Sequence, residues 1–227
     1  MKLILLPGLG ADGRLFDGVR CPGTEIVTPA FPEPAPRQSL PSYARALADR
    51  LWIGPGDAVG GASFGGFVAA EIAARRPVAA LVLIGSALSP REVPSYYAVL
   101  EGLSRLVPDG VFARAPRNHP LVLAKFGRLT ATQRALFLEM AGRASPALLR
   151  RGMRMIFGWK GVDRAEIACP IHRIHGRLDR LIRPPSAREA ELIEGVGHLI
   201  SMTNPGRVGR FLAERLQRKG STGRNPP

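Results

Sequence analysis

Short apolar runs alternate with amphipathic segments along most of the chain. Six runs are rich in Val, Ile and Leu, with little alternation between apolar and polar positions: residues 2–6, 25–28, 57–61, 79–86, 170–176 and 191–197. Such runs are typical of strands that are buried on both faces of a parallel sheet. The pattern therefore predicts about six strands with helices covering both faces.

Helical spacing of apolar residues recurs between and after these runs, at residues 41–51, 64–76, 130–143, 145–157 and 204–219. Thr130 and Gln133 form a capping-box pattern, and Ser145 before Pro146 has the order of an N-cap followed by a proline in the first turn. Asn204, which also precedes a proline, predicts a third helix start. Strands alternating with helices predict an α/β fold with a doubly wound, mostly parallel sheet.

One segment breaks the alternation. Residues 88–160 contain several helix patterns and no strand pattern. We expect them to form a helical cap over the strand ends, inserted between two core segments, residues 1–87 and 161–219. Residues 220–227 are polar and carry two prolines, so a disordered tail is expected there.

Composition narrows the class of protein. The chain has 227 residues, of which 45% are hydrophobic, enough to bury one core. No apolar run approaches the roughly 18 residues needed to span a membrane, and the first residues lack a cleavage-site pattern, which favours a cytoplasmic protein. Cys21 and Cys169 lie far apart without metal-ligand spacing, which argues against a disulfide framework or a zinc site.

The chain is strongly basic, with a formal net charge of +14, and residues 88–160 hold twelve basic residues against four acidic ones. Two interpretations of this basic segment stay open. It binds an acidic carrier protein or anionic substrates, or it is only a solvated face. Arg150, Arg151 and Arg154 are its densest cluster. The basic residues are not interleaved with aromatics, so nucleic acid is not predicted as a partner. No pattern specifies an oligomeric state.

Two glycine-rich loops follow predicted strands. Gly8 to Gly13 fits the G-x-G-x-x-G pattern of dinucleotide-binding proteins. Glu33 lies 20 residues after Gly13, where those proteins have an acidic residue that binds the ribose. However, residues 14–23 are too short and too interrupted by glycine and proline to form the long helix that would hold a pyrophosphate. The loop therefore does not predict a cofactor.

The second loop, Gly61 to Gly65, fits G-x-S-x-G between a strand and a helix, the context of a nucleophile elbow. A sharp turn that holds Ser63 in a strained conformation leaves no room for side chains two positions before and after it. A glycine-rich structural turn is the alternative at this point.

Two later strand ends favour the elbow. A serine nucleophile needs a base, and the base needs an acidic partner that fixes its tautomer. Asp179 follows the strand at 170–176, and His198 follows the strand at 191–197. Both should lie at the sheet edge that carries Ser63, and the chain order Ser, Asp, His matches this architecture.

At this point the sequence resembles the α/β-hydrolase superfamily over essentially its whole length. The resemblance is carried by four segments in order, LLPGLGADGRLF, GGASFGGFVAAEIA, IHGRLDRLI and GVGHLI. The first is most similar to that of a group of small bacterial esterase-like hydrolases with a PGLGAD loop. Pro7 stands where many relatives have histidine. The given chain begins with the strand that follows an N-terminal hairpin in many relatives, so the resemblance implies a sheet of about six strands instead of eight.

The resemblance implies a triad of Ser63, His198 and Asp179, and an oxyanion hole formed by the backbone N–H groups of Leu9 and Phe64. It implies no metal and no organic cofactor. The predicted function is a serine hydrolase that cleaves carboxylic esters of small molecules through an acyl-enzyme. The alternatives are an esterase or thioesterase for acyl groups on an acidic carrier protein, and a ligand-binding scaffold without catalysis.

The remaining candidates have structural interpretations. We expect His175 to brace the loop of Asp179, and His172 to lie in the core or on a face of the sheet. His119 is expected in a solvated loop and Asp12 in a turn. Only some ten residues separate Asp179 from the last strand, so a full helix is not expected between them.

Overall fold

A single six-stranded sheet forms the centre of the molecule in the computed structural model, which describes residues 1–95, 102 and 124–217. The strand order is β2-β1-β3-β4-β5-β6, and all neighbouring pairs are parallel. The strands are β1 (Lys2–Leu6), β2 (Glu25–Val27), β3 (Ala58–Ala62), β4 (Ala80–Ile84), β5 (Ile171–Gly176) and β6 (Glu191–Ile193). The predicted parallel α/β architecture is confirmed, although β6 is shorter than the apolar run suggested.

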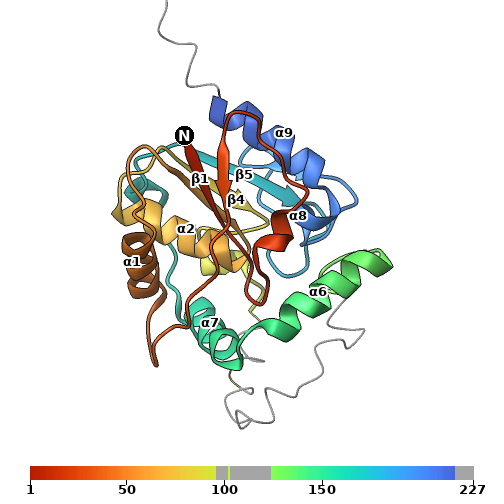
Figure 1. Cartoon of the computed structure of the whole chain (residues 1–227), viewed down its shortest axis with the longest axis horizontal. Helices are drawn as coiled ribbons and strands as arrows, with labels where there is room; N and C mark the ends of the chain where they lie inside the picture. The colour runs from red at the N-terminus through yellow and green to blue at the C-terminus, as the bar shows by residue number, and fades with distance from the viewer. Residues whose placement is uncertain (96–101, 103–123, 218–227) are drawn as a thin grey trace, which may run out of the picture.

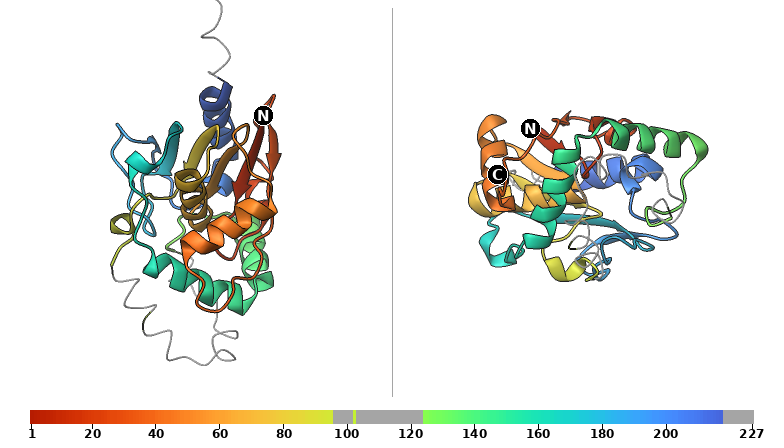
Figure 2. Two further views of the ribbon diagram at one scale, coloured as in Figure 1. Left: turned by 90° about the vertical axis from the view of Figure 1, so that its left-hand side faces the viewer. Right: turned by 90° about the horizontal axis from the view of Figure 1, so that it is seen from below.

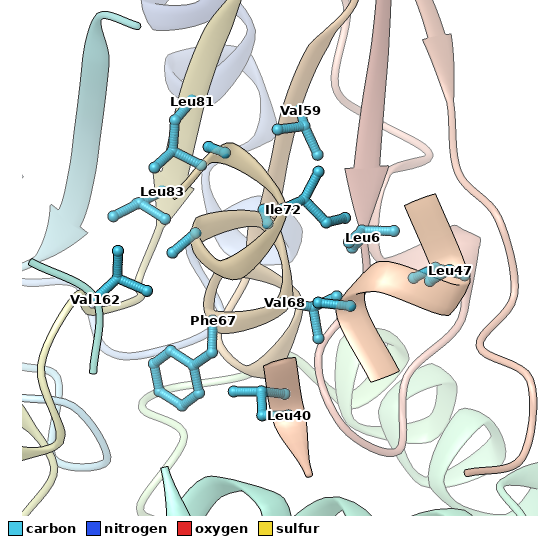
Figure 3. Packing of buried hydrophobic residues seen from close by; sticks show 14 of the residues in the cluster. Leu6, Leu40, Leu47, Val59, Phe67, Val68, Ile72, Leu81, Leu83 and Val162 are labelled. Atoms are coloured by element: carbon cyan, nitrogen blue, oxygen red, sulfur yellow. The ribbon is translucent and has the colours of Figure 1, made fainter. Parts of the chain in front are cut away.

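Helices cover both faces of this sheet (Figure 1). They are α1 (Leu40–Arg50), α2 (Phe64–Arg75), α6 (Ala131–Arg143), α7 (Pro146–Gly158), α8 (Ile200–Thr203) and α9 (Pro205–Leu216), with short 3-10 turns η1 (Gly13–Phe16), η2 (Pro90–Glu92) and η3 (Arg164–Glu166). Alternate residues of β1 divide the core: Ile4 and Leu6 pack with α1 and α2, whereas Leu3 and Leu5 pack with α9. Figure 3 shows the first of these clusters around α2.

All three predicted helix starts are found, and in two of them the side chain of the N-cap residue makes a capping hydrogen bond. The Thr130 hydroxyl accepts from the Gln133 amide, and Gln133 bonds back to the Thr130 amide, so the predicted capping box is present. Ser145 caps α7 through the Leu148 amide at 3.0 Å. Asn204 lies at the N-cap of α9 but its side chain makes no capping bond. The preceding turn α8 ends directly at Asn204, which gives its backbone a different conformation.

The described part of the predicted cap consists of η2, α6 and α7. Two views at right angles show α6 and α7 together beyond one end of the sheet (Figures 1 and 2). At the C-terminal end of α7, the Trp159 indole donates to the buried carboxylate of Glu71 on α2 at 2.6 Å. The boundaries of the core and cap segments remain our proposal, and His119 and residues 220–227 lie outside the described residues.

The first glycine loop does not lead into a long helix. Gly13 begins the four-residue turn η1, and Asp12 caps it by accepting from the Arg14 amide at 3.0 Å. Glu33 pairs with Arg151 on α7 and accepts from the Ser145 hydroxyl. These contacts agree with the interpretation of Asp12 as a turn residue, and they give Glu33 a role in holding α7.

Residues 180–190, between the Asp179 loop and β6, form turns and bends without a helix, as the short connection suggested. The chain's two cysteines form no disulfide with each other. Cys21 is buried, while Cys169 is partly buried and packs against the first core cluster.

Candidate active site

The turn between β3 and α2 holds Ser63 in a strained conformation. Its backbone has φ 52° and ψ −120°, a region that L-residues rarely adopt. A Cβ on Gly65 would overlap the carbonyl of Leu6, and one on Gly61 would overlap the backbone of Gly65. The two glycines therefore have the steric role that the motif predicted, because β1 passes directly against the turn.

A second serine, Ser86, supports this turn. It follows β4, is 1% exposed, and its hydroxyl donates to the Ser63 carbonyl at 2.7 Å. The Ser63 carbonyl also accepts from the Gly66 amide at 2.9 Å, while the Ser63 amide donates to Ile84 on β4 at 3.1 Å. Sequence reasoning missed Ser86, although its place directly after a strand that neighbours β3 is a signal that could have identified it.

Asp179 lies in the loop after β5 with its carboxylate fully engaged. Oδ1 accepts from the amides of Leu181 at 2.8 Å and Ile182 at 3.0 Å. Oδ2 faces two imidazoles, Nδ1 of His198 at 2.7 Å and Nε2 of His175 at 2.9 Å. The structure thus brings together Asp179 and His198, which are separated by one strand in the sequence.

The electrostatic environment keeps this carboxylate ionised. Burial opposes ionisation, because the side chain has no exposed surface. The charge of His198 and the hydrogen bonds from His175 and His198 outweigh burial, so the pKa of Asp179 lies well below its ordinary value. An ionised carboxylate accepts hydrogen bonds only, so Nδ1 of His198 is the donor and Nε2 is left for other chemistry.

Phe126 also holds His198 in place. Its backbone amide donates to the Phe126 carbonyl at 3.2 Å, and the Phe126 ring lies 6.0 Å from the imidazole. The segment around Phe126 belongs to the region between β4 and α6, so a part of the chain remote in sequence positions this histidine.

His175 contacts Asp179 directly. Its Nε2 also lies 3.2 Å from the Ile182 carbonyl, and both neighbours are acceptors, so this nitrogen carries the proton. This contact agrees with the expectation that His175 braces the loop of Asp179. His172, three residues earlier in β5, is partly buried.

An apolar cavity of about 390 Å³ opens in front of Ser63 and His198, which both line it. Leu9 lines it as well, whereas Asp179 lies behind His198 and Phe64 does not reach the wall. The Phe64 ring instead packs edge-on against Phe31, 5.2 Å away. The described apolar wall comes from several elements and includes Leu15, Phe67, Phe126, Phe137, Ile156 and Leu199.

Two backbone amides near the nucleophile were predicted to form an oxyanion hole. The Phe64 amide is the first of α2, and within the residues that the structure describes neither it nor the Leu9 amide donates a hydrogen bond. A Cβ on Gly8 would lie 3.7 Å from the Ser63 Cβ, so the loop that carries Leu9 runs close to the nucleophile. Their role as donors stays a prediction.

In the described ranges, no group of three or more histidine, cysteine or carboxylate side chains is arranged to hold a metal ion. Among these residues, no helix has the length and apolar character needed to cross a membrane.

The comparison with protein families identifies the family of the chain. A family model described as "Alpha/beta hydrolase family" matches residues 3–210. The chain belongs to this family. No curated protein sequence matched the chain in the corresponding comparison.

Solved structures share the fold at low sequence identity. A thermophilic esterase from Thermogutta terrifontis is 18% identical with a TM-score of 0.74, covering 96% of this chain and 90% of its own. The enol-lactonase from Burkholderia xenovorans LB400 is 17% identical with a TM-score of 0.69, covering 95% and 91%. The meta-cleavage product hydrolase from Pseudomonas fluorescens IP01 is 17% identical with a TM-score of 0.68, covering 97% and 92%. At these identities the likeness concerns the fold, and the three names differ in substrate.

Proposed function

We propose that this α/β hydrolase is a serine hydrolase that cleaves carboxylic esters of uncharged, largely apolar small molecules. The observation that carries the proposal is the lining of one apolar cavity by both Ser63 and His198, with His198 bonded to the ionised carboxylate of Asp179. A serine, an imidazole and a carboxylate in this order form the machinery of acyl transfer.

In the first half of the proposed reaction, Ser63 Oγ attacks the ester carbonyl carbon while His198 Nε2 takes the hydroxyl proton. The carbonyl oxygen becomes an oxyanion that accepts hydrogen bonds from the amides of Leu9 and Phe64, a contribution of about 3 kcal/mol for each donor. Collapse breaks the bond to the alcohol oxygen, which leaves with the proton from His198. Ser63 is then acylated.

The second half repeats these steps with water. His198 takes a proton from the water as its oxygen attacks the acyl carbon, and returns it to Ser63 Oγ when the carboxylic acid leaves. Asp179 keeps His198 in one tautomer and stabilises the imidazolium in both halves. Ester and water become acid and alcohol, and no other reactant is consumed.

The character of the cavity supports the substrate class. No charged acid or amine side chain lines it among the described residues, so a charged substrate group would lose its hydration without a partner. A neutral substrate with apolar acyl or alcohol groups fits the wall instead.

Ser63→Ala is the test of this function. We expect hydrolysis of p-nitrophenyl esters to be abolished with the melting temperature preserved, because only the nucleophile is removed. Mass spectrometry of the wild type should place an organophosphonate adduct on Ser63. Ser42→Ala, at an exposed position of α1, is the matched control and should keep full activity. An adduct on another serine would reject the assignment, and a wild type that binds esters without cleaving them would favour a binding scaffold.

A further inference from the structure

The short helix α8 places a buried hydroxyl on the wall of the cavity. Ser201 is 2% exposed and lines the cavity, and its Oγ has no hydrogen-bond partner among the described residues. A buried hydroxyl without a partner costs about 1–3 kcal/mol. Buried polar groups are otherwise almost always satisfied, so this atom is suited to a partner that enters the cavity.

The surroundings limit what this partner can be. Ser63, His198 and Ser201 are the polar side chains among the described lining residues, and the first two already have roles in the proposed reaction. The rest of the described wall is apolar and carries no charge that could balance an ion. An uncharged polar atom within an otherwise apolar molecule is the matching partner.

The hydroxyl of Thr203, on the same turn, provides a comparison for that of Ser201. On the same turn, the Thr203 hydroxyl donates to the Leu199 carbonyl at 3.1 Å, whereas the Ser201 hydroxyl does not donate to the backbone. The turn is fixed from the cap, because Gln133 on α6 donates to the Met202 carbonyl at 3.1 Å. Ser201 therefore presents an unused hydroxyl at a fixed position, and its O–H can donate to an acceptor oxygen.

We propose that Ser201 determines substrate specificity by donating a hydrogen bond to an uncharged acceptor oxygen, an ether or a ketone, that lies apart from the scissile ester. This inference rests on the proposed ester hydrolysis and adds a second recognition point to it. The substrate class is then an apolar ester with one additional neutral oxygen in its acyl or alcohol part.

The test compares matched esters. In each pair an ether oxygen replaces one methylene, moved stepwise along the acyl chain in one series and along the alcohol chain in the other. For at least one position we expect the kcat/KM ratio of the oxygenated ester to its hydrocarbon analogue to fall about 3- to 10-fold in Ser201→Ala, the range of one neutral hydrogen bond. Thr203→Val, which removes a hydroxyl from the same turn, should leave this ratio unchanged.

A binding measurement separates this inference from the proposed function. Ser63→Ala and the double variant Ser63→Ala/Ser201→Ala should bind the same ester pairs, and calorimetry should show the same 3- to 10-fold loss in relative affinity. If the wild type cleaves no ester, the proposed function is rejected while the binding ratios still decide on Ser201. If esters are cleaved but no position in either series shows a ratio that depends on Ser201, the inference is overturned and the hydrolase assignment stands.

Discussion

Asp179 is the residue on which most of the site's polar contacts converge. Its two oxygens accept four N–H groups, from two backbone amides and two imidazoles. An amide in its place has only one acceptor oxygen, so its NH₂ group must face N–H donors on one side. This conflict cannot be relieved by rotation, since both sides of the carboxylate are used.

Asp179→Asn should therefore lower kcat by roughly 10²–10⁴, because His198 is driven to the tautomer that cannot accept the Ser63 proton. Steady-state kinetics on a p-nitrophenyl ester measures this. Asp163→Asn, at the exposed N-cap of η3, is the control and should be close to wild type. Unchanged turnover in Asp179→Asn would mean that another carboxylate serves His198.

The lowered pKa of Asp179 also has a consequence for stability. A carboxyl group with a folded-state pKa below its ordinary 3.8 stabilises the fold at pH values above 3.8, and this contribution is lost as the pH falls further. We expect the unfolding free-energy difference between wild type and Asp179→Asn to shrink below about pH 3.8 in denaturant titrations. A difference that grows on acidification would contradict this.

At the scale of the elements, helix α7 packs against the core and also lines the cavity. Gly152 lets this helix approach the loop after β1, because a Cβ there would overlap the side chain of Leu9. Gly158, at the end of the same helix, has no atom within 4 Å of the corresponding position. The two glycines thus form a matched pair on one element.

Gly152→Ala should reduce kcat/KM by up to about 10-fold, because its Cβ would meet the end of the Leu9 side chain, in the loop whose Leu9 amide we assign to the oxyanion hole. Gly158→Ala should keep full activity and gain up to about 1 kcal/mol of stability from helix propensity. Kinetics and urea unfolding of both variants provide the measurement. Equal activities would show that α7 does not position this loop.

The contact between α2 and the C-terminal end of α7 contains a buried acid. Burial raises the pKa of Glu71, and the hydrogen bond from Trp159 and the charge of Arg75 only partly oppose this. An acid with a raised pKa holds its proton more tightly when folded, so stability falls as the pH rises above its ordinary value of 4.5.

Glu71→Gln removes this dependence and keeps an oxygen that accepts from the Trp159 indole. We expect the unfolding free energy of the variant, relative to wild type, to improve steadily as the pH is raised from about 4.5. Denaturant unfolding of both proteins across this pH range measures the effect. Parallel pH profiles would show that the carboxyl group is not desolvated in the folded protein.

For the whole molecule, the structure changes the interpretation of the basic surplus. The three arginines predicted as the densest cluster have different environments, although they share α7. Arg150 is 8% exposed, Arg151 pairs with Glu33 at 3.0 Å, and Arg154 is exposed. A docking site for an acidic carrier protein that is built from all three is therefore not present on the surface.

We expect the salt response of catalysis to reflect this dispersal. Between about 0.01 and 0.5 M salt the Debye length shrinks from roughly 30 Å to below 8 Å. kcat/KM should change little, and to a similar extent, for a small neutral ester and for the same acyl group on an acidic carrier protein. A steep decline for the carrier substrate alone, reduced in Arg154→Gln, would instead establish charge-steered docking.

The sequence by itself determined the order of strands and helices, the elbow at Ser63 and the strand ends that carry Asp179 and His198. These features are local: periodicity reports burial of an element, glycine reports close backbone approach, and parallel strands place their carboxyl ends along one edge. The family resemblance rests on the same local segments. Even the caps of α6 and α7 follow from residues three positions apart.

Tertiary structure decided which side chains from separate elements meet. The Ser86 bond to the elbow, the burial of Arg150 and the unsatisfied hydroxyl of Ser201 all depend on how remote segments pack. Spacing along a helix fixes the angle between neighbouring residues but not which of them turns toward the core. That choice is made only when the apolar stripes of all elements are buried together.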